Sequence, residues 1–175
     1  MMSLFFKTKN SPKDVRALKI RQAMKKDATE IVRLSGLLSK ADSTNPSRLT
    51  EEIYCEDGFG DNPAFNALLA EIDTQVIGYT LYFEGYDTNR AKRGLYISDI
   101  YVDEAWRRQG VGRSLMQATA QVCRDLGGEW VFWAVNKQNR AARKFYQTLA
   151  TEISEISIFA ALGQNFQTLC GSSAK

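Results

Sequence analysis

The chain has 175 residues, of which 44% are hydrophobic and 25% are charged, as in an ordinary globular protein long enough to bury a core. Its formal net charge of +3 is too small to indicate a nucleic-acid-binding protein. Histidine is absent, which excludes Ser-His-Asp and Cys-His catalytic sites and most zinc sites, so we expect no metal.

The first residues of the chain carry no convincing targeting signal. Residues 1–16 contain one short apolar patch and no cleavage-like region, and no apolar run in the chain approaches the length of a membrane span. We therefore expect residues 1–16 to form an N-terminal tail and residues 17–175 to fold as a single domain.

The first half of the chain predicts a helix between strands. Apolar spacing predicts a helix from about Asp27 to Lys40, and Asp27 followed by Glu30 is typical of a helix start. Residues 41–63 are polar and contain two prolines, which predicts loops around a short helix near 47–55. Strand-like patterns lie at 17–23, 64–72 and 75–86, the last two joined by a turn at Asp73-Thr74.

The second half of the chain alternates strands and helices. A strand at 94–102 precedes a glycine turn and then an amphipathic helix that ends at Gly127-Gly128. The apolar run at 130–135 predicts a strand buried on both faces. A helix at 138–149, a strand at about 152–161 and a short helix at about 163–170 follow. This order predicts a mixed α/β sheet.

The glycine turn, Arg-Arg-Gln-Gly-Val-Gly at 107–112, stands at the start of a predicted helix. Glycine lets backbone N–H groups turn toward an anion, and a helix N-terminus adds partial positive charge. A Walker loop requires a lysine after Gly112, and a dinucleotide loop requires glycine or alanine where Leu115 stands, so neither fits. The pattern Arg/Gln-x-x-Gly-x-Gly/Ala, typical of acyl-CoA-dependent N-acetyltransferases, fits every position.

Two further segments match the same family at the usual separation. Asp99-Ile-Tyr-Val102 precedes the glycine turn, and Asn139-x-x-Ala-x-x-Phe-Tyr146 lies in the later helix. Over roughly residues 17–170 the chain resembles the GNAT superfamily of N-acetyltransferases, and most of all its spermidine/spermine (diamine/thialysine) group. The resemblance implies an α/β GNAT fold: a mixed central sheet of about six to seven strands flanked by helices, with the fourth and fifth strands splayed at the CoA site.

The resemblance also implies acetyl-CoA as the cosubstrate. The backbone at Ile100 and Val102 would pair with the pantetheine arm, and Asn139 would bond its amides or simply start a helix. Lys144 would reach the ribose phosphate, with a solvated surface charge as the alternative. The turn would hold the pyrophosphate through Arg107, Arg108, Gln109, Gly110, Val111, Gly112, Arg113 and Ser114.

The same resemblance assigns Tyr146 as the acid that protonates the leaving thiolate, with a tyrosine that serves only packing as the alternative. The general base is open, because Ser98 stands where the polyamine group has a glutamate. Asp99 is our candidate, although strand alternation points it to the other face unless a bulge intervenes. Glu84, Tyr101 or a water chain are the alternatives. Ala150 replaces a usual glycine after the later helix, which we expect to shift a turn without abolishing the site.

Acidic residues indicate a cationic acceptor. The resemblance places Asp87 where the polyamine group carries an acid that meets the substrate, and Glu84 lies on the same strand. Glu51 and Glu52 belong to an acidic stretch at 41–62, on the side where this fold has its acceptor wall. A solvated acidic face is the alternative reading of that stretch.

The sequence therefore predicts an acetyl-CoA-dependent N-acetyltransferase acting on a small cationic amine, such as a polyamine, diamine or basic amino acid. The alternatives are an acetyltransferase of protein lysines or N-termini, and a noncatalytic CoA-binding module. We expect no nucleic-acid or membrane partner, and a homodimer stays open. Three widely spaced cysteines, Cys55, Cys123 and Cys170, suit reduced thiols in a cytoplasmic protein.

Overall fold

The computed structural model describes residues 17–42 and 45–171, so the predicted tail at 1–16 lies outside the described residues. The chain forms two compact units, one that ends at Asn139 and one that begins at Arg140. That residues 17–175 fold as a single domain stays a prediction. The three cysteines are free thiols, and Cys123 is the buried one.

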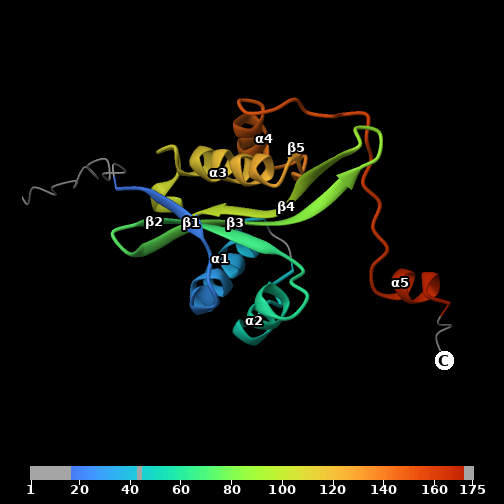
Figure 1. Ribbon diagram of the computed structural model, residues 1–175, viewed down its shortest axis with the longest axis horizontal. Coiled ribbons are helices and arrows are strands. Elements are labelled where there is room, and N and C mark those ends of the chain that lie inside the picture. Colours follow the sequence, from blue (N-terminus) through green and yellow to red (C-terminus); the bar gives the residue numbers. More distant parts are fainter. Residues whose placement is uncertain (1–16, 43–44, 172–175) are drawn as a thin grey trace, which may run out of the picture. The chain divides into compact units, whose positions relative to one another are not determined.

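A five-stranded sheet lies at the centre of the first unit (Figure 1). The strands lie in sequence order, and neighbours are antiparallel except β4 and β5, which are parallel. A parallel pair needs a crossover connection, and the third helix supplies it. The strands are β1 Lys19–Gln22, β2 Asn66–Ile72, β3 Gln75–Asp87, β4 Lys92–Val102 and β5 Gly128–Trp133.

The strand predicted at 152–161 does not form, so the described chain has five strands and not the predicted six to seven. These residues are irregular apart from a turn at 154–155. Their apolar side chains are exposed, and Phe159 reaches 93%. A strand needs a neighbour for its N–H and C=O groups, and a local apolar pattern does not supply that neighbour.

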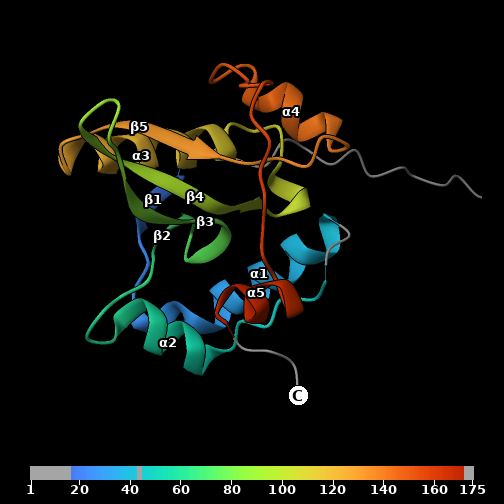
Figure 2. The same cartoon turned by 90° about the vertical axis from the view of Figure 1, so that its right-hand side faces the viewer.

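Two helices, α1 Ala28–Ala41 and α2 Glu51–Phe59, cover one face of the sheet, and α3 Val111–Asp125 covers the other (Figures 1 and 2). α1 and α3 lie where the sequence predicted them, whereas α2 begins and ends four residues later than expected. The α1 side of the core is packed by fully buried side chains: Ile31, Leu34, Tyr54, Leu69 and Tyr79.

A charged cluster fixes the start of α1 against the edge of the sheet. Asp27, the last residue of a short 3-10 helix, accepts bonds of 2.7 and 2.9 Å from the Arg21 guanidinium and one of 2.8 Å from the Met24 N–H. Arg21 also donates to Glu71 of β2 at 2.8 Å. The bond from Arg21 is the main reason that the pKa of Asp27 lies below its usual value.

The α3 helix turns its apolar stripe toward the opposite face, with Val111, Leu115 and Cys123 buried. The neighbouring strand β5 differs from the prediction, because only Trp130 in it is buried. β5 is the last strand of the sheet and has a strand neighbour on one side alone, so its apolar run did not indicate burial on both faces.

The second unit contains two short helices, α4 Arg140–Tyr146 and α5 Gln164–Leu169. α4 is shorter than the helix predicted at 138–149, because residues 147–149 continue as turns. Arg143 of α4 donates two hydrogen bonds to Glu152, at 2.8 and 3.0 Å. α5 falls within the helix predicted at about 163–170.

Candidate active site

Asp99 reaches the α1 face of the sheet because β4 carries a bulge. Tyr82 of β3 pairs with Ile97, and the preceding residue Leu81 pairs with Asp99, so Ser98 is the extra residue. Without this residue, strand alternation would send the Asp99 side chain to the α3 face. The bulge that the sequence analysis required for Asp99 to change faces is therefore present.

A buried tyrosine holds the carboxyl group of Asp99. The Tyr79 hydroxyl donates to Asp99 Oδ2 at 2.7 Å, and the Thr80 hydroxyl donates to the Asp99 backbone carbonyl at 3.0 Å. Burial raises the pKa of Asp99 above its usual value; the bond from Tyr79 opposes that shift, and the negative charge of Asp42 adds to it. A carboxyl in such surroundings is suited to accept a proton.

Asp42 is the charged neighbour of Asp99 that the sequence did not single out. It directly follows the last residue of α1, and its Oδ1 accepts a hydrogen bond of 3.2 Å from Asn139 Nδ2. Asn139, expected to bond the pantetheine amides, therefore lies beside this carboxylate. The only sequence signal for Asp42 was the acidic content of residues 41–62, which does not show which of these acids lies near Asp99.

The pairing of β4 with β5 stops partway along β4. The last pair joins Ile97 to Trp133, whereas β4 continues to Val102. Asp99, Ile100 and Val102 thus lie in a part of β4 that pairs with β3 and not with β5. This geometry agrees with the expected divergence of the fourth and fifth strands.

The glycine turn joins the end of β4 to α3. A 3-10 helix at Glu104–Trp106 follows β4, and Gly110 directly precedes α3 with a φ of +88°. Arg108 also has a positive φ, +61°, which non-glycine residues rarely adopt. The turn offers backbone N–H and guanidinium groups, the donors that bind a pyrophosphate, so its chemistry fits CoA.

Two side chains of this turn bond back to the protein. Arg107 donates to the Val102 carbonyl at 2.9 Å, and its guanidinium lies 5.3 Å from the centroid of the Tyr101 ring. Gln109 donates to the Ala105 carbonyl at 3.1 Å. Both side chains therefore brace the turn. Arg108 and Arg113 are exposed, and the Ser114 N–H bonds the Gly110 carbonyl at 3.0 Å as part of the first turn of α3.

Two of the acids predicted to meet the acceptor have other partners. Asp87 accepts bonds from the backbone N–H groups of Asn89 and Arg90, at 2.9 and 3.2 Å, and pairs with the Arg90 guanidinium, so it closes the β3–β4 turn. Glu84 pairs with Arg93 at 3.1 Å, and alternation along β3 sends it to the face opposite Leu81. The structure does not bring Glu84 to the side of Asp99.

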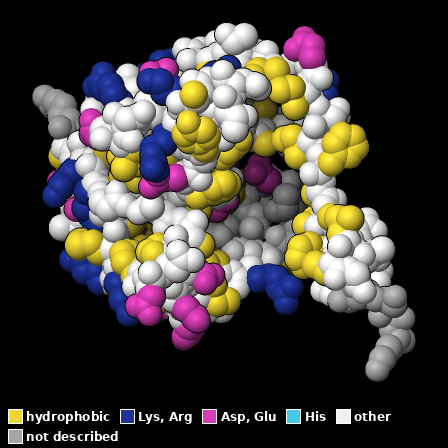
Figure 3. Space-filling model, turned by 45° about the vertical axis from the view of Figure 1, so that its right-hand side comes forward, with side chains coloured by type: hydrophobic (Ala, Val, Ile, Leu, Met, Phe, Trp, Pro, Cys, Tyr) yellow, Lys and Arg dark blue, Asp and Glu magenta, His cyan; other side chains and the backbone are white. Residues whose placement is uncertain are grey.

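The other two acids, Glu51 and Glu52, lie together at the start of α2. Thr50 caps this helix by accepting a bond from the Ile53 N–H at 3.3 Å. Both carboxylates are exposed in the first turn, where negative charge suits the helix dipole. Figure 3 shows acidic side chains gathered at the lower edge of the face it presents, where α2 lies.

Tyr146 and Lys144 belong to α4 in the second unit. Tyr146 is half-buried with its ring 5.3 Å from that of Phe145, and Lys144 is exposed. The roles of both residues stay predictions. Ala150 follows this helix without a positive φ, and its N–H bonds the Tyr146 carbonyl at 2.9 Å, so the turn accommodates alanine in place of the usual glycine.

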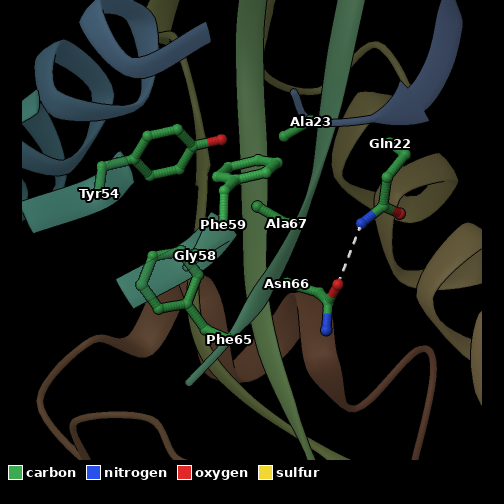
Figure 4. Close-up of a pocket in the computed structure, with 8 residues that line it drawn as sticks. All are labelled: Gln22, Ala23, Tyr54, Gly58, Phe59, Phe65, Asn66 and Ala67. Atoms are coloured by element: carbon green, nitrogen blue, oxygen red, sulfur yellow. Dashed lines mark hydrogen bonds between the residues drawn. The ribbon is translucent and has the colours of Figure 1, made fainter. Parts of the chain in front are cut away.

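A small hollow between α2 and the sheet contains none of the predicted site residues (Figure 4). The Tyr54 ring lies 5.4 Å from Phe59 and 5.9 Å from Phe65, so packed aromatic rings line the hollow. Its lining residues are Gln22, Ala23, Tyr54, Gly58, Phe59, Phe65, Asn66 and Ala67.

Comparison with known proteins identifies the class of this enzyme. The model of the acetyltransferase (GNAT) family matches residues 31–150, and the chain belongs to this family. It is therefore an acyltransferase, and enzymes of this family use acetyl-CoA as the cosubstrate. In the part of the chain that the structure describes, no helix is long and apolar enough to cross a membrane.

Individual relatives agree with this assignment, and solved structures share the fold. A thialysine N-epsilon-acetyltransferase of Sus scrofa is 34% identical over 146 residues, 78% of this chain and 85% of the relative. A spermidine/spermine N(1)-acetyltransferase-like protein of Homo sapiens is 30% identical over 135 residues, 73% of this chain and 19% of the relative. A crystal structure of an aminoglycoside acetyltransferase from an uncultured soil metagenomic sample, in complex with sisomicin, is similar with a TM-score of 0.73 at 24% identity. The match covers 86% of this chain and 100% of the chain in that structure.

Proposed function

We propose that this acetyltransferase modifies a primary amine of a small cationic molecule, such as a polyamine, a diamine or a basic amino acid. The observation that carries the proposal is that Asp99 lies in the segment of β4 that β5 leaves unpaired, where the negative charge of Asp42 helps to raise the pKa of Asp99. Two carboxylates in one place attract an ammonium group. The names of the relatives, which specify thialysine and spermidine/spermine, support the same class of acceptor.

Asp99 is the general base in this proposal. The acceptor arrives as an ammonium ion, which has no lone pair, so a proton must leave before the nitrogen attacks the thioester carbonyl. Asp99 takes that proton at Oδ1, since Oδ2 accepts the bond from Tyr79. Asp42 keeps the local potential negative while the amine is neutral. A backbone N–H of the unpaired β4 segment, near Ile100, stabilises the developing oxyanion.

Tyr146 is the acid that we propose for the leaving thiolate, on the resemblance of its motif alone. Tyr146→Phe should lower kcat by roughly 10- to 10⁴-fold, the range for a lost proton donor, with little change in CoA affinity. Steady-state assays of CoA release at several pH values measure kcat of the variant. Full activity at every pH would remove Tyr146 from the mechanism.

A panel of amines tests the acceptor class directly. We expect CoA release with thialysine, spermidine, diamines or ornithine, and little with a peptide whose N-terminus or lysine is the amine. Asp99→Asn should lower kcat by about 10²-fold, as expected for a lost base. Asp42→Asn should chiefly raise KM, whereas Asp125→Asn, which removes an exposed acid at the end of α3, should leave both constants unchanged.

Glu51 and Glu52 add long-range attraction in the same proposal. Changing both to glutamine should raise KM for a diamine at low salt and have less effect at high salt, because salt screens exposed charges. If KM for every cationic amine stayed at the parent value, these two residues would have no acceptor role.

Acetylation of protein lysines or N-termini is the second candidate, and preferential acetylation of the peptide in the panel would favour it. We also propose a homodimer and a cytoplasmic location, the latter because free Cys55, Cys123 and Cys170 suit a reducing compartment. Fractionation of the source cells tests the location.

A further inference from the structure

Four aromatic side chains contact one another on one face of the sheet, where β4 is paired with β5. Phe83 of β3 pairs with Tyr96 of β4, and their rings stack with centroids 5.5 Å apart. The Tyr96 ring also lies 5.0 Å from the ring of Trp130 and 5.9 Å from that of Phe132, both in β5. We call these four residues the aromatic cluster.

The aromatic cluster lies on the same face of the sheet as Asp99. Leu81 pairs with Asp99 and packs against the buried core on the α1 side. Phe83 is two residues further along β3, so strand alternation puts it on that same face, about 7 Å from Leu81. The Phe83–Tyr96 pair is therefore the next pair on this face, in the direction away from the end of β4.

Two glycines make room for the rings. Gly85 and Gly94 are paired beside the aromatic cluster, and a Cβ on Gly94 would overlap the Trp130 ring. A Cβ on Gly85 would lie 2.7 Å from the Tyr96 ring and 2.8 Å from the Trp130 ring. The Trp130 indole N–H donates to the Lys92 carbonyl at 3.2 Å. The strands therefore set the positions of these rings.

The outer part of the aromatic cluster is open to solvent. Phe83 is 41% exposed and Tyr96 is 40% exposed, whereas Trp130 is buried. The far half of the β3–β4 hairpin extends past α1 and α2 (Figures 1 and 2). Large rings that are packed together and still exposed are typical of a binding surface.

The faces of these rings are suited to a cation, because the face of an aromatic ring carries partial negative charge. The guanidinium of Arg90 lies 6.0 Å from the centroid of the Phe132 ring, within the range of this interaction. The two acids that the sequence assigned to the acceptor are bound elsewhere, since Asp87 pairs with Arg90 and Glu84 pairs with Arg93. Ring faces supply negative potential on this side of Asp99 instead.

We propose that the exposed faces of Phe83 and Tyr96 bind a second ammonium group of the acceptor, and so select diamines and polyamines over monoamines. This proposal rests on the proposed function, in which the reacting amine lies at Asp99 and CoA lies at the unpaired end of β4. The rest of the acceptor then runs the other way along the sheet, toward Phe83 and Tyr96. The step between the two residue pairs, about 7 Å, is close to the length of a short diamine.

Tyr96→Leu and Phe83→Leu test the proposal, because leucine keeps an apolar side chain and has no ring face. The quantity to measure is kcat/KM for cadaverine divided by kcat/KM for pentylamine, which has the same carbon chain and one ammonium group. We expect each substitution to lower this ratio roughly 3- to 30-fold, the range for the loss of one cation–π contact. Tyr96→Phe keeps a ring face and should retain the parent ratio.

Tyr86→Leu is the matched control. Tyr86 is 61% exposed and belongs to the same strand as Phe83, but strand alternation sends it to the opposite face. We expect this variant to have the parent ratio. Titration with CoA checks that the cosubstrate site of every variant is intact, and light scattering checks that the mass of the particle is unchanged.

A lower ratio in both leucine variants, with parent-like CoA affinity and mass, supports the cation site. Equal losses with cadaverine and pentylamine would mean that the rings bind only the carbon chain, and an unchanged ratio would mean that they do not bind the second ammonium group. Either result overturns the proposal and leaves the proposed function standing. A changed mass would assign the aromatic cluster to contact with a second copy and overturn the proposal as well. If the parent released no CoA with any amine, the proposed function itself would fall.

Discussion

Asp27 and Asp99 are two carboxyls whose surroundings move their pKa values in opposite directions. Asp27 meets a guanidinium that bonds both of its oxygens, so its charged form is favoured. Asp99 is shielded from water and lies near a second carboxylate, so its neutral form is favoured. The stability of the protein therefore responds to the two residues with opposite signs as pH changes.

We expect Asp27→Asn to lower the free energy of unfolding at pH 7 by about 2–4 kcal/mol, because it leaves the Arg21 charge poorly compensated. Since the folded pKa of Asp27 is depressed, its contribution is present above the unfolded value of 3.8 and is lost as pH falls through the folded pKa. Urea unfolding at pH 7 and pH 3 measures this. The double variant Arg21→Met with Asp27→Leu should recover part of the loss; no recovery would contradict the pairing argument.

Asp99→Asn should have the opposite effect on stability. The folded pKa of Asp99 is raised, so its contribution is fully present below the unfolded value of 3.8 and is lost as pH rises through the folded pKa. Relative to the parent, the variant should therefore gain stability as pH rises above 3.8 and through the folded pKa, while it loses activity. The same urea series checks this, and a variant that grew less stable than the parent as pH rose would refute the raised pKa.

At the scale of elements, the start of α3 depends on the backbone of one glycine. Gly110 has a φ of +88° with open space around an added Cβ, so conformation alone opposes a side chain there. Gly110→Ala should lower the free energy of unfolding by about 1–2 kcal/mol. Gly36 in the middle of α1 has the same open space, and there Gly36→Ala should stabilise by up to about 1 kcal/mol.

Thermal unfolding of both glycine variants, with titration of CoA, completes the comparison. The Gly110 variant should also bind CoA more weakly, because the turn would no longer hold its N–H groups in one direction. Equal changes in the free energy of unfolding for Gly36→Ala and Gly110→Ala would mean that the positive φ of Gly110 does not affect stability.

At the scale of the whole molecule, the second unit exposes many apolar side chains. Phe159 is 93% exposed and Ile158 is 77% exposed, and Leu162 and Leu169 are similar. Such exposure is unusual for side chains that have no partner in the assembled protein. Light scattering should therefore give twice the chain mass of 19.7 kDa, and Phe159→Glu should shift the mass toward that of one chain. A single-chain mass for the parent would contradict the homodimer.

Sequence reasoning identified most elements of the first unit and the class of the enzyme. The helices had clear periodicity, and the glycine turn had a spacing that admits few chemistries. The predictions of a strand at 152–161 and of burial on both faces of β5 were wrong, because both features depend on neighbours that lie far away in the sequence. The acids Asp87 and Glu84 were plausible by position, yet local arginines pair with them.

The sequence by itself determined the periodic helices, the glycine turn that precedes α3 and the family, since each depends on residues close together in the chain. Tertiary structure alone decided the surroundings of Asp99. The bulge at Ser98 turns its side chain toward α1, and Tyr79 and Asp42 then come to it from 20 and 57 positions earlier. Such contacts arise from strand register and helix packing, and the energy that orders them is spread over the whole core rather than encoded in a local pattern.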